Sequence, residues 1–163
     1  MEISFDIRGY LKPYEIIEMN PLLFETIFVE SFEESVSRRL IFEAFQRYNS
    51  ELSAIIKEPY LQWVDGSFVT NKENPNDIDI LTFIDYRIYK RFEKEIDAKF
   101  SKYSVKTHFQ GIDAYTVWAY PENHTFYNVY RSDYAYWQEW FSYSRYNRAK
   151  KRFPKGFIQM IIN

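Results

Sequence analysis

The chain of 163 residues contains no cysteine and only two histidines. Without cysteine, disulfides and thiolate metal sites are excluded, and nothing marks the chain as secreted. The two histidines, His108 and His124, do not form a metal-ligand pair with a recognisable spacing. They therefore predict no metal site.

Long apolar runs and a strong charge excess are also missing. No run approaches the roughly 20 residues of a membrane-spanning helix. The N-terminal MEISFDIRGYL has acidic residues and lacks the apolar core of a signal peptide. The net charge of −2 gives no global electrostatic reason to bind nucleic acid or a membrane, so such binding would need a local patch. We expect a soluble, cytoplasmic protein without a membrane partner.

Motifs of several enzyme classes are absent as well. The chain has no Walker-type phosphate loop, no dinucleotide fingerprint and no nucleophile motif of the hydrolase kind. Hydrophobic residues make up 46% of the chain and charged residues 27%, which is typical of a globular protein. No repeat or linker interrupts it, so we expect a single domain over residues 1–163.

Aromatic residues, in contrast, are abundant. They make up 21% of the chain, with 15 tyrosines and 15 phenylalanines. One interpretation is a core and a sheet surface built from aromatic side chains. The other is a stacking platform for bases or a surface for a partner.

The pattern of apolar residues predicts an α+β fold, α/β-like in character. Asn20-Pro21 is typical of a helix start, with a capping side chain before a proline at the first helical position. The longest helical pattern spans residues 32–57, with Val36 and Leu40 among its apolar positions and Pro59 after its end. Further segments are expected as an extended stretch at 3–10, strands at 60–64, 77–84, 105–109, 112–119 and 157–162, and helices at 22–30, 86–100 and 121–141.

Two carboxylates share one side of a strand that is otherwise apolar. Asp77 and Asp79 alternate with Ile78 and Ile80, and residues i and i+2 of a strand point to the same face. Adjacent carboxylates repel each other and lose hydration, so a protein holds them together most easily when a cation neutralises them. Such oxygen ligands suit Mg²⁺ or Mn²⁺, and Asp113 on a later strand is the candidate third ligand. Two metals can then stabilise both oxygens of a phosphoryl displacement.

Gly66-Ser67, before the acidic strand, is the candidate phosphate-binding turn. Glycine allows a close approach of the backbone, and serine offers a hydroxyl and an N–H group. Lys72, in the following loop, is a second candidate phosphate ligand, with a solvated loop as the alternative. The basic stretch at residues 145–156 suits a triphosphate or an RNA backbone, with a solvated loop that balances an acidic protein as the alternative. Lys155 is its preferred phosphate ligand.

Other charged positions have simpler interpretations. Arg38 and Arg39 lie in the long helix, where ion pairs with Glu33 or Glu34 are expected; the alternative is that one of the two arginines faces the site. Asp65 is expected to cap the turn that follows it.

The order of these motifs resembles the signature of the DNA polymerase β-type nucleotidyltransferase superfamily. The motifs are Gly66-Ser67, Asp77-Ile78-Asp79 and Ile112-Asp113-Ala114. The short chain resembles the minimal nucleotidyltransferases, and more closely a bacterial family of that fold. Three further segments of this chain resemble motifs of that bacterial family. They are FDIRGYLKP at residues 5–13, WVDGSF at 63–68 and a Lys-Gly step before the last strand.

The resemblance implies a mixed sheet with helices packed mainly on one side. It also implies transfer of a nucleoside monophosphate, AMP from ATP in the first instance, to a hydroxyl with Mg²⁺ or Mn²⁺. Asp77 and Asp79 would hold the metals, Asp113 would complete the site and help to activate the acceptor, and Gly66 and Ser67 would cradle the triphosphate. The implied acceptor is a protein side chain or a tRNA 3′ end, in a toxin–antitoxin or phage-defence setting.

Two alternatives remain open at this stage. The first is a catalytically inactive protein of the same fold, acting as a nucleotide sensor or as an antitoxin-like partner of a cognate toxin. It predicts an exposed aromatic patch around Tyr134, Tyr136, Trp137 and Trp140. The second is a structural domain whose carboxylates are solvated.

Overall fold

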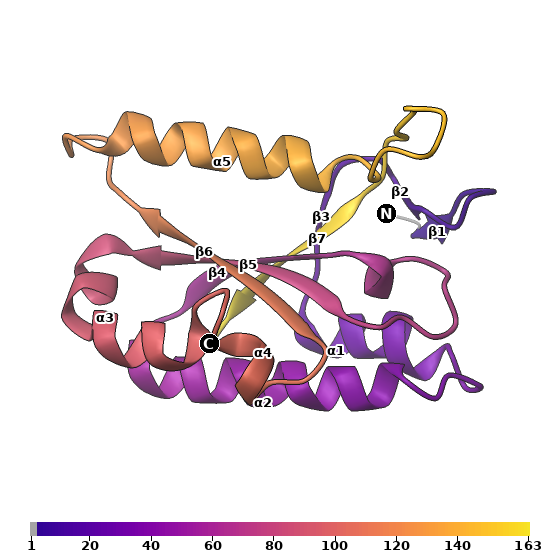
Figure 1. Cartoon of the computed structure of the whole chain (residues 1–163), viewed down its shortest axis with the longest axis horizontal. Coiled ribbons are helices and arrows are strands. Elements are labelled where there is room, and N and C mark those ends of the chain that lie inside the picture. Colours follow the sequence, from indigo (N-terminus) through magenta and orange to yellow (C-terminus); the bar gives the residue numbers. More distant parts are fainter. Residues whose placement is uncertain (1–2) are drawn as a thin grey trace.

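The computed structural model describes residues 3–163. Within this range the chain forms five α-helices, a mixed five-stranded sheet and a small two-stranded hairpin, which confirms the α+β class (Figure 1). The helices are α1 (Pro21–Glu25, continued by a π-helical turn, Thr26–Glu30), α2 (Arg38–Ile56), α3 (Tyr86–Phe100), α4 (Val105–His108) and α5 (Tyr127–Phe141). The strands are β1 (Ser4–Phe5), β2 (Leu11–Lys12), β3 (Ile16–Glu18), β4 (Tyr60–Asp65), β5 (Ile78–Asp85), β6 (Ile112–Ala119) and β7 (Phe157–Ile162).

The pairing within the large sheet decides where the acidic residues meet. Its strand order is β3-β7-β4-β5-β6. β4 runs antiparallel to β5, whereas β6 runs parallel to β5. The end of β4 and the beginnings of β5 and β6 therefore lie at the same end of the sheet, with β5 in the middle.

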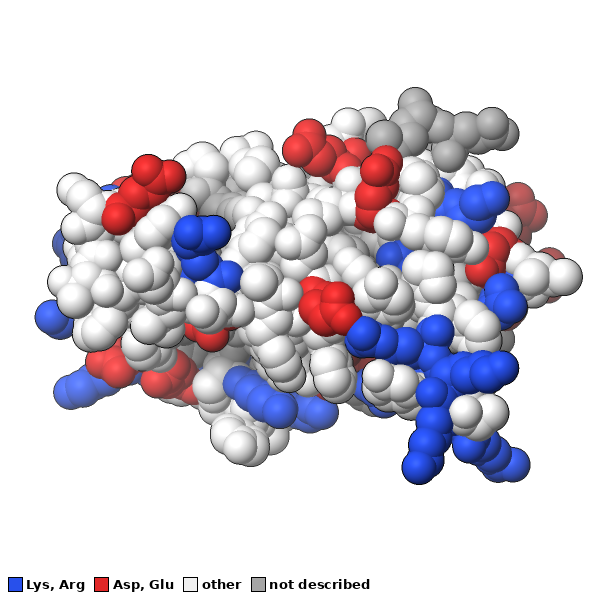
Figure 2. Space-filling model, turned by 90° about the horizontal axis from the view of Figure 1, so that it is seen from above, with Lys and Arg blue, Asp and Glu red and all other residues white. Residues whose placement is uncertain are grey.

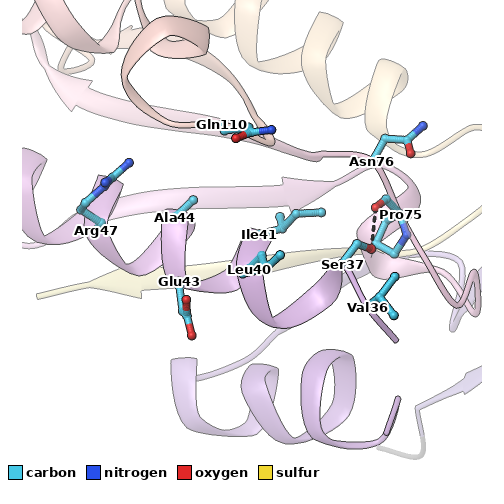
Figure 3. A pocket seen from close by; sticks show the side chains of 10 residues that line it. All are labelled: Val36, Ser37, Leu40, Ile41, Glu43, Ala44, Arg47, Pro75, Asn76 and Gln110. Carbon is cyan, nitrogen blue, oxygen red and sulfur yellow. Dashed lines mark hydrogen bonds between the residues drawn. The ribbon is translucent and has the colours of Figure 1, made fainter. Parts of the chain in front are cut away.

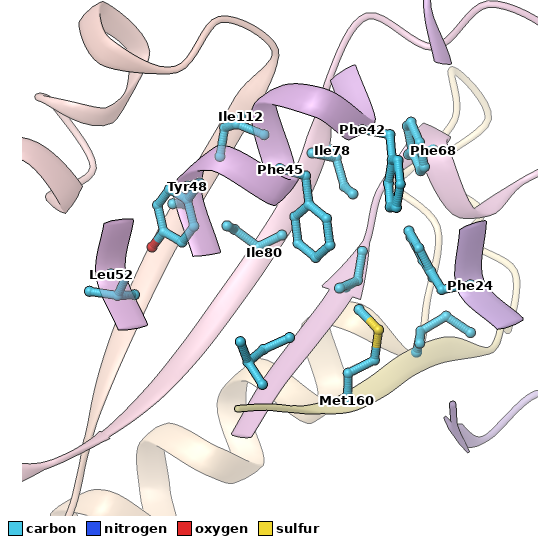
Figure 4. Packing of buried hydrophobic residues seen from close by; sticks show 14 of the residues in the cluster. Phe24, Phe42, Phe45, Tyr48, Leu52, Phe68, Ile78, Ile80, Ile112 and Met160 are labelled. Carbon is cyan, nitrogen blue, oxygen red and sulfur yellow. The ribbon is translucent and has the colours of Figure 1, made fainter. Parts of the chain in front are cut away.

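The two faces of the sheet are covered unequally. Helices α1 to α4 pack on one face, and α5 alone crosses the other (Figure 1). Phe42, Phe45 and Tyr48 of α2 meet Ile78 and Ile80 of β5 in the larger core (Figure 4). A smaller core joins sheet residues Trp63, Leu81, Phe83, Val117 and Phe157 to Phe141 of α5. Aromatic side chains fill much of both cores, as the first interpretation of the composition predicted.

Several predicted boundaries are confirmed. Asn20 caps α1, because its side-chain oxygen accepts a hydrogen bond of 2.8 Å from the Leu23 N–H, and Pro21 is the first helical residue. Helix α3 and strand β6 have the predicted bounds, and β5 is shifted by one residue. Along β5, Ile78 and Ile80 are buried on the α2 side, so the predicted alternation is correct.

The long helix begins later than its pattern predicted. The Asn74 side-chain oxygen accepts a hydrogen bond of 2.8 Å from the Val36 N–H, and the Ser37 hydroxyl donates one of 2.7 Å to the Pro75 carbonyl. These contacts with a distant loop hold residues 35–37 out of the helix. Val36, outside the helix, is 78% exposed, and Leu40 is 66% exposed, so these two apolar positions of the pattern do not lie in the core.

Three further assignments are corrected. Residues 105–108 form α4 instead of a strand, because the buried Val105 and Phe109 are four residues apart and face the core together. Residues 121–126 form turns before α5. The predicted extended stretch at 3–10 contains only β1 before the chain turns, with Gly9 at φ 83°, into β2.

No helix within residues 3–163 has the length and apolar character to cross a membrane.

Candidate carboxylate site

Three aspartates lie side by side across three neighbouring strands. Asp65 is the last residue of β4, and Asp79 and Asp113 are the second residues of β5 and β6. Asp79 pairs with Asp65 in the antiparallel ladder and with Asp113 in the parallel one. Because paired residues on adjacent strands point to the same face, their carboxylates form a row, here called the aspartate row. Asp113, whose register the sequence does not define, lies directly beside Asp79.

The aspartate row lies on the face that carries α5. Tyr115 follows Asp113 by two positions on β6, so both side chains share one face. The Tyr115 ring packs on Trp137 of α5, with 4.5 Å between the ring centroids. Burial raises the pKa of the Tyr115 hydroxyl, and the charges of Asp113 and Asp79 raise it further.

Asp77 stands just outside the row. It precedes β5 by one residue and is exposed, whereas Asp79 is half-buried. Its negative charge contributes to the raised pKa of Asp79. The structure thus places the three predicted acids at one end of the sheet, with Asp65 beside Asp79.

Gly66 lies against the central carboxylate of the row. Its φ is 84°, in the region that favours glycine. A Cβ atom at position 66 would lie 2.0 Å from Oδ2 of Asp79. The Asp79 carboxylate therefore occupies the space that a side chain at position 66 would fill. Because residue 66 is glycine, the turn can lie this close to β5.

The ionised form of Asp79 is disfavoured by burial and by the neighbouring negative charges. Burial raises its pKa from 3.8 to about 7, and the charges of Asp65, Asp77 and Asp113 contribute to this rise. The positive charge of Arg145 acts in the opposite direction. Near neutral pH the Asp79 carboxyl therefore exists in both protonation states, and a bound cation would favour the ionised one.

Asp65 is neutralised by a buried lysine. Lys155 donates a hydrogen bond from its ammonium to Oδ1 of Asp65, and both side chains are buried. Burial raises the pKa of Asp65, and the Lys155 ammonium opposes this rise. Asp65 was thus wrongly interpreted as a simple turn cap. The alternation of Trp63 and Asp65 along β4 was the available sequence signal.

Asp113 has one oxygen without a partner. Its Oδ1 is buried and accepts no hydrogen bond within residues 3–163. Its Oδ2 lies 3.7 Å from the ammonium of Lys106, whose side chain is mostly exposed. A buried oxygen that is not hydrogen-bonded is costly, and it is an available ligand for a cation or a donor.

The donor set fits a divalent cation in kind. Carboxylate oxygens are the ligands that Mg²⁺ and Mn²⁺ prefer, and the aspartate row with Asp77 supplies four carboxyl groups. The unpartnered Oδ1 of Asp113 and the negative charges around Asp79 both favour binding of a cation. Within residues 3–163, no three acidic or histidine side chains converge closely enough to hold an ion. Metal binding by Asp77, Asp79 and Asp113 stays a prediction that requires these side chains to turn toward a common point.

The candidate phosphate ligands occupy different places. Ser67 begins a single turn of 3₁₀-helix next to the row, and its hydroxyl makes no hydrogen bond within the described chain. Lys155 lies at the row, where Asp65 binds its ammonium. Lys72 is exposed in the loop after this turn, and no ion pair among residues 3–163 joins it to the row.

Arg38 holds this loop in place. Its guanidinium is buried and donates hydrogen bonds of 2.6–2.8 Å to four carbonyl oxygens, those of Phe28, Phe68, Thr70 and Lys72. Burial lowers the pKa of Arg38 to about 10. The expected ion pair with Glu33 or Glu34 was therefore wrong, and Arg38 instead fixes the chain between Gly66-Ser67 and β5.

A pocket of about 600 Å³ opens on the helix side of the same strand ends. Its lining combines the exposed face of α2 with Asn76 and Gln110, which closely precede β5 and β6 (Figure 3). No member of the aspartate row lines this pocket. The pocket and the row are thus separate features at one end of the sheet.

Comparison with known proteins gives one positive result. The model of a protein family described as "Family of unknown function (DUF6932)" matches residues 3–161. No curated protein and no solved structure matches the chain.

Proposed function

Since the chain belongs to this family of unknown function, we propose an activity from the site itself: the protein is a metal-dependent nucleotidyltransferase. It would transfer a nucleoside monophosphate, AMP from ATP in the first instance, to a hydroxyl on a protein or RNA acceptor. The observation that carries the proposal is the pairing of Asp79 with both Asp65 and Asp113, beside the Gly66-Ser67 turn.

The arrangement of strands supports the proposed polymerase β-type fold. The turn with Gly66 connects β4 to the antiparallel β5, which carries Asp79, and the third acid follows on the parallel β6. Four of the five helices pack on one face, as the resemblance implies. Helix α5 covers part of the other face, which makes this chain different from a sheet that is open on one side.

Each residue then has a defined task. Asp77, Asp79 and Asp113 would hold Mg²⁺ or Mn²⁺, which would screen the triphosphate charge and favour the ionised acceptor oxygen. The Gly66 and Ser67 N–H groups and the Ser67 hydroxyl would bind phosphate oxygens. Lys155 has three donors, so it can bind the triphosphate while it retains Asp65. Lys72 would contribute from its loop.

The proposed reaction is a displacement at the α-phosphorus. The acceptor oxygen forms a bond to this phosphorus while the bond to the bridging oxygen of the leaving pyrophosphate breaks. The proton of the acceptor hydroxyl passes to a carboxylate, for which Asp113 with its unpartnered Oδ1 is the candidate base. The products are the nucleotidylated acceptor and pyrophosphate.

The test is a calorimetric titration of each of the four NTPs, in Mg²⁺ and again in EDTA. We expect one NTP to bind only with Mg²⁺, and Asp79→Asn and Asp113→Asn to lose at least tenfold in affinity, since each removes a charge that faces the ion. Glu95→Gln on α3 is the matched control, an exposed carboxylate at a distance from the row. Release of pyrophosphate with the protein or RNA acceptor tests the transfer itself.

The outcome decides between distinct functions. A wild-type protein that binds no NTP in Mg²⁺ would overturn the nucleotidyltransferase proposal. Unchanged NTP affinity in Asp79→Asn would show that the NTP does not bind at the aspartate row.

A second candidate function, partner binding without catalysis, is favoured by a groove between α5 and the edge strand β6. The groove has a volume of about 430 Å³, and Trp118, Tyr120 and Phe126 are among its lining residues. Of the predicted aromatic patch, Tyr136 and Trp140 are exposed and stacked, with 6.2 Å between centroids. Tyr134 and Trp137 instead pack against the sheet, so the patch is smaller than predicted. A cognate toxin is the proposed partner, and this function predicts a wild-type protein that binds no NTP.

A further inference from the structure

Residues 142–155 form a folded arm that the sequence suggested only as a basic loop. Three backbone hydrogen bonds of 2.8–2.9 Å cross it, from Ser144 N–H to the Phe153 carbonyl, from Asn147 N–H to the Lys151 carbonyl and from Lys155 N–H to the Ser142 carbonyl. Tyr143 and Pro154 form an antiparallel bridge between them. This arm, here called the basic hairpin, joins α5 to β7 and projects from one end of the molecule (Figure 1).

The tip of the basic hairpin has a defined backbone. The Asn147 side-chain oxygen accepts hydrogen bonds from the N–H groups of Ala149 and Lys151, at 2.9 and 3.0 Å. Lys150 takes a left-handed conformation, with φ 55°, which closes the turn. The tip is therefore held in a turn that presents the side chains of Arg148, Lys150 and Lys151 to solvent.

All the charged side chains of the basic hairpin are positive. Residues 142–155 contain six Lys and Arg side chains and no Asp or Glu, in a chain whose net charge is −2. Arg152 pairs with Glu139, and Lys155 pairs with Asp65. Within residues 3–163 the other four cations, Arg145, Arg148, Lys150 and Lys151, form no ion pair. Figure 2 shows Lys and Arg side chains gathered at the end of the molecule from which the hairpin projects.

Aromatic rings lie among these cations. The Arg152 guanidinium carbon lies 4.2 Å from the centroid of Tyr143 and 5.5 Å from that of Tyr146. Tyr146 is 67% exposed, so one face of its ring is open to a ligand. Cations that follow a phosphate backbone, next to an exposed ring that stacks on a base, are the two elements of a surface for single strands.

The base of the basic hairpin reaches the aspartate row. Lys155, at this base, donates a hydrogen bond to Asp65 of the row, and both side chains are buried. A strand that runs from the hairpin tip to this base would therefore bring its end to the row. Lys155 neutralises Asp65, which would otherwise repel the last phosphate.

We propose that the basic hairpin docks a single-stranded nucleic acid, with phosphates on Arg148, Lys150 and Lys151 and a base stacked on Tyr146. The role of this strand as acceptor, with its terminal hydroxyl at the aspartate row, rests on the proposed nucleotidyltransferase function. The docking itself does not rest on it. A membrane surface is a poorer match, because Ala149, the one exposed aliphatic side chain at the described hairpin tip, is too small to insert.

The test measures fluorescence anisotropy of labelled 12-nucleotide RNA and DNA strands, in EDTA and without NTP, so that it is independent of catalysis. We expect the triple variant Arg148→Gln/Lys150→Gln/Lys151→Gln to bind at least tenfold more weakly than the wild type. On single strands each phosphate contact contributes about 0.7 to the slope of log K against log salt, so the slope should fall by about 2. The matched control, Lys90→Gln/Arg91→Gln/Lys94→Gln, removes three exposed cations from α3.

A pair of variants at one position tests the stacking. Tyr146→Ala should lose about tenfold in affinity, whereas Tyr146→Phe retains the ring and should bind as the wild type does. Comparing RNA with DNA identifies which strand is the ligand, and tighter binding of either supports the docking. Lack of binding by the wild type, an equal loss in the α3 control or equally tight binding of a duplex would overturn the proposal. A protein that binds the strand but no NTP would contradict the proposed nucleotidyltransferase function and not the docking proposal.

Discussion

The Asp79 carboxylate occupies the space that a side chain at position 66 would need. A Cβ atom built on Gly66 would lie 2.0 Å from Asp79 Oδ2 and 3.0 Å from its Cγ. Gly66 directly follows Asp65, which pairs with Asp79 across the antiparallel strands β4 and β5. The identity of residue 66 therefore controls the position of the central carboxylate.

Gly66→Ala should displace this carboxylate. The added methyl group conflicts with Asp79, and alanine is strained at a φ of 84°, so we expect a loss of about 1–3 kcal/mol in the free energy of unfolding. Mg²⁺-dependent NTP binding should fall in the same calorimetric assay. Gly9→Ala is the matched control, since Gly9 has φ 83° and its Cβ would meet only the end of the Asn71 side chain. Equal NTP affinity in both variants would contradict the argument.

The raised pKa of Asp79 makes stability depend on pH. The pKa is about 7 in the native state, against an ordinary value of 3.8 for an aspartate in the unfolded chain, so the native state binds this proton more tightly. Its contribution is present in full below about pH 4 and is lost as the pH rises to 7. We expect the wild type to lose up to about 4 kcal/mol in unfolding free energy over this interval.

Asp79→Asn should remove most of this dependence and should be more stable than the wild type at pH 8. Urea unfolding at pH 5, 6, 7 and 8 measures both effects, with Glu95→Gln as the control. Parallel pH profiles for the wild type and Asp79→Asn would show that Asp79 is not the group that titrates.

The buried pair of Asp65 and Lys155 gives a prediction with an internal control. Lys155→Met leaves a buried carboxylate without its partner, which should cost about 3–5 kcal/mol of unfolding free energy at pH 8. The double variant Asp65→Asn/Lys155→Met removes both charges and should recover much of that loss. Chemical denaturation of the two variants makes the comparison. If the double variant is no more stable than the single one, the pair does not act as a unit.

Arg38 gives a prediction about the loop before β5. Arg38→Met removes hydrogen bonds to four carbonyl oxygens that lie in or near the interior, so we expect a loss of about 3 kcal/mol or more. The neighbouring Arg39→Met removes only an exposed ion pair with Glu25 and should cost about 1 kcal/mol or less. Thermal unfolding of both variants is the measurement. Hydrogen exchange of residues 68–72 should increase in Arg38→Met alone.

Local patterns predicted the central elements of this fold well. The alternation in β5 and β6 and the amphipathic pattern of α3 gave these elements nearly their observed bounds. The start of α2 was wrong because Asn74, distant in the sequence, holds Val36 outside the helix. No local signal contains such a contact.

In the candidate site, too, local patterns predicted some residues, whereas contacts between residues distant in the sequence were not predicted. Asp79 and Asp113 could be proposed as site residues because each stands near the start of a mostly apolar strand. The roles of Asp65 and Arg38 depend on partners distant in the sequence, Lys155 for one and the loop carbonyls for the other. Strand order decides that Asp65 stands beside Asp79, and the sequence does not specify that order.

The aspartate row also has a consequence for folding kinetics. Its three members come from separate strands, so an unfolded chain keeps their charges apart and the repulsion arises only as β4, β5 and β6 pair. If the row forms before the transition state, raising the pH slows folding; if it forms afterwards, raising the pH speeds unfolding. The carboxylates that make the site thus act as a built-in probe of when the central strands assemble.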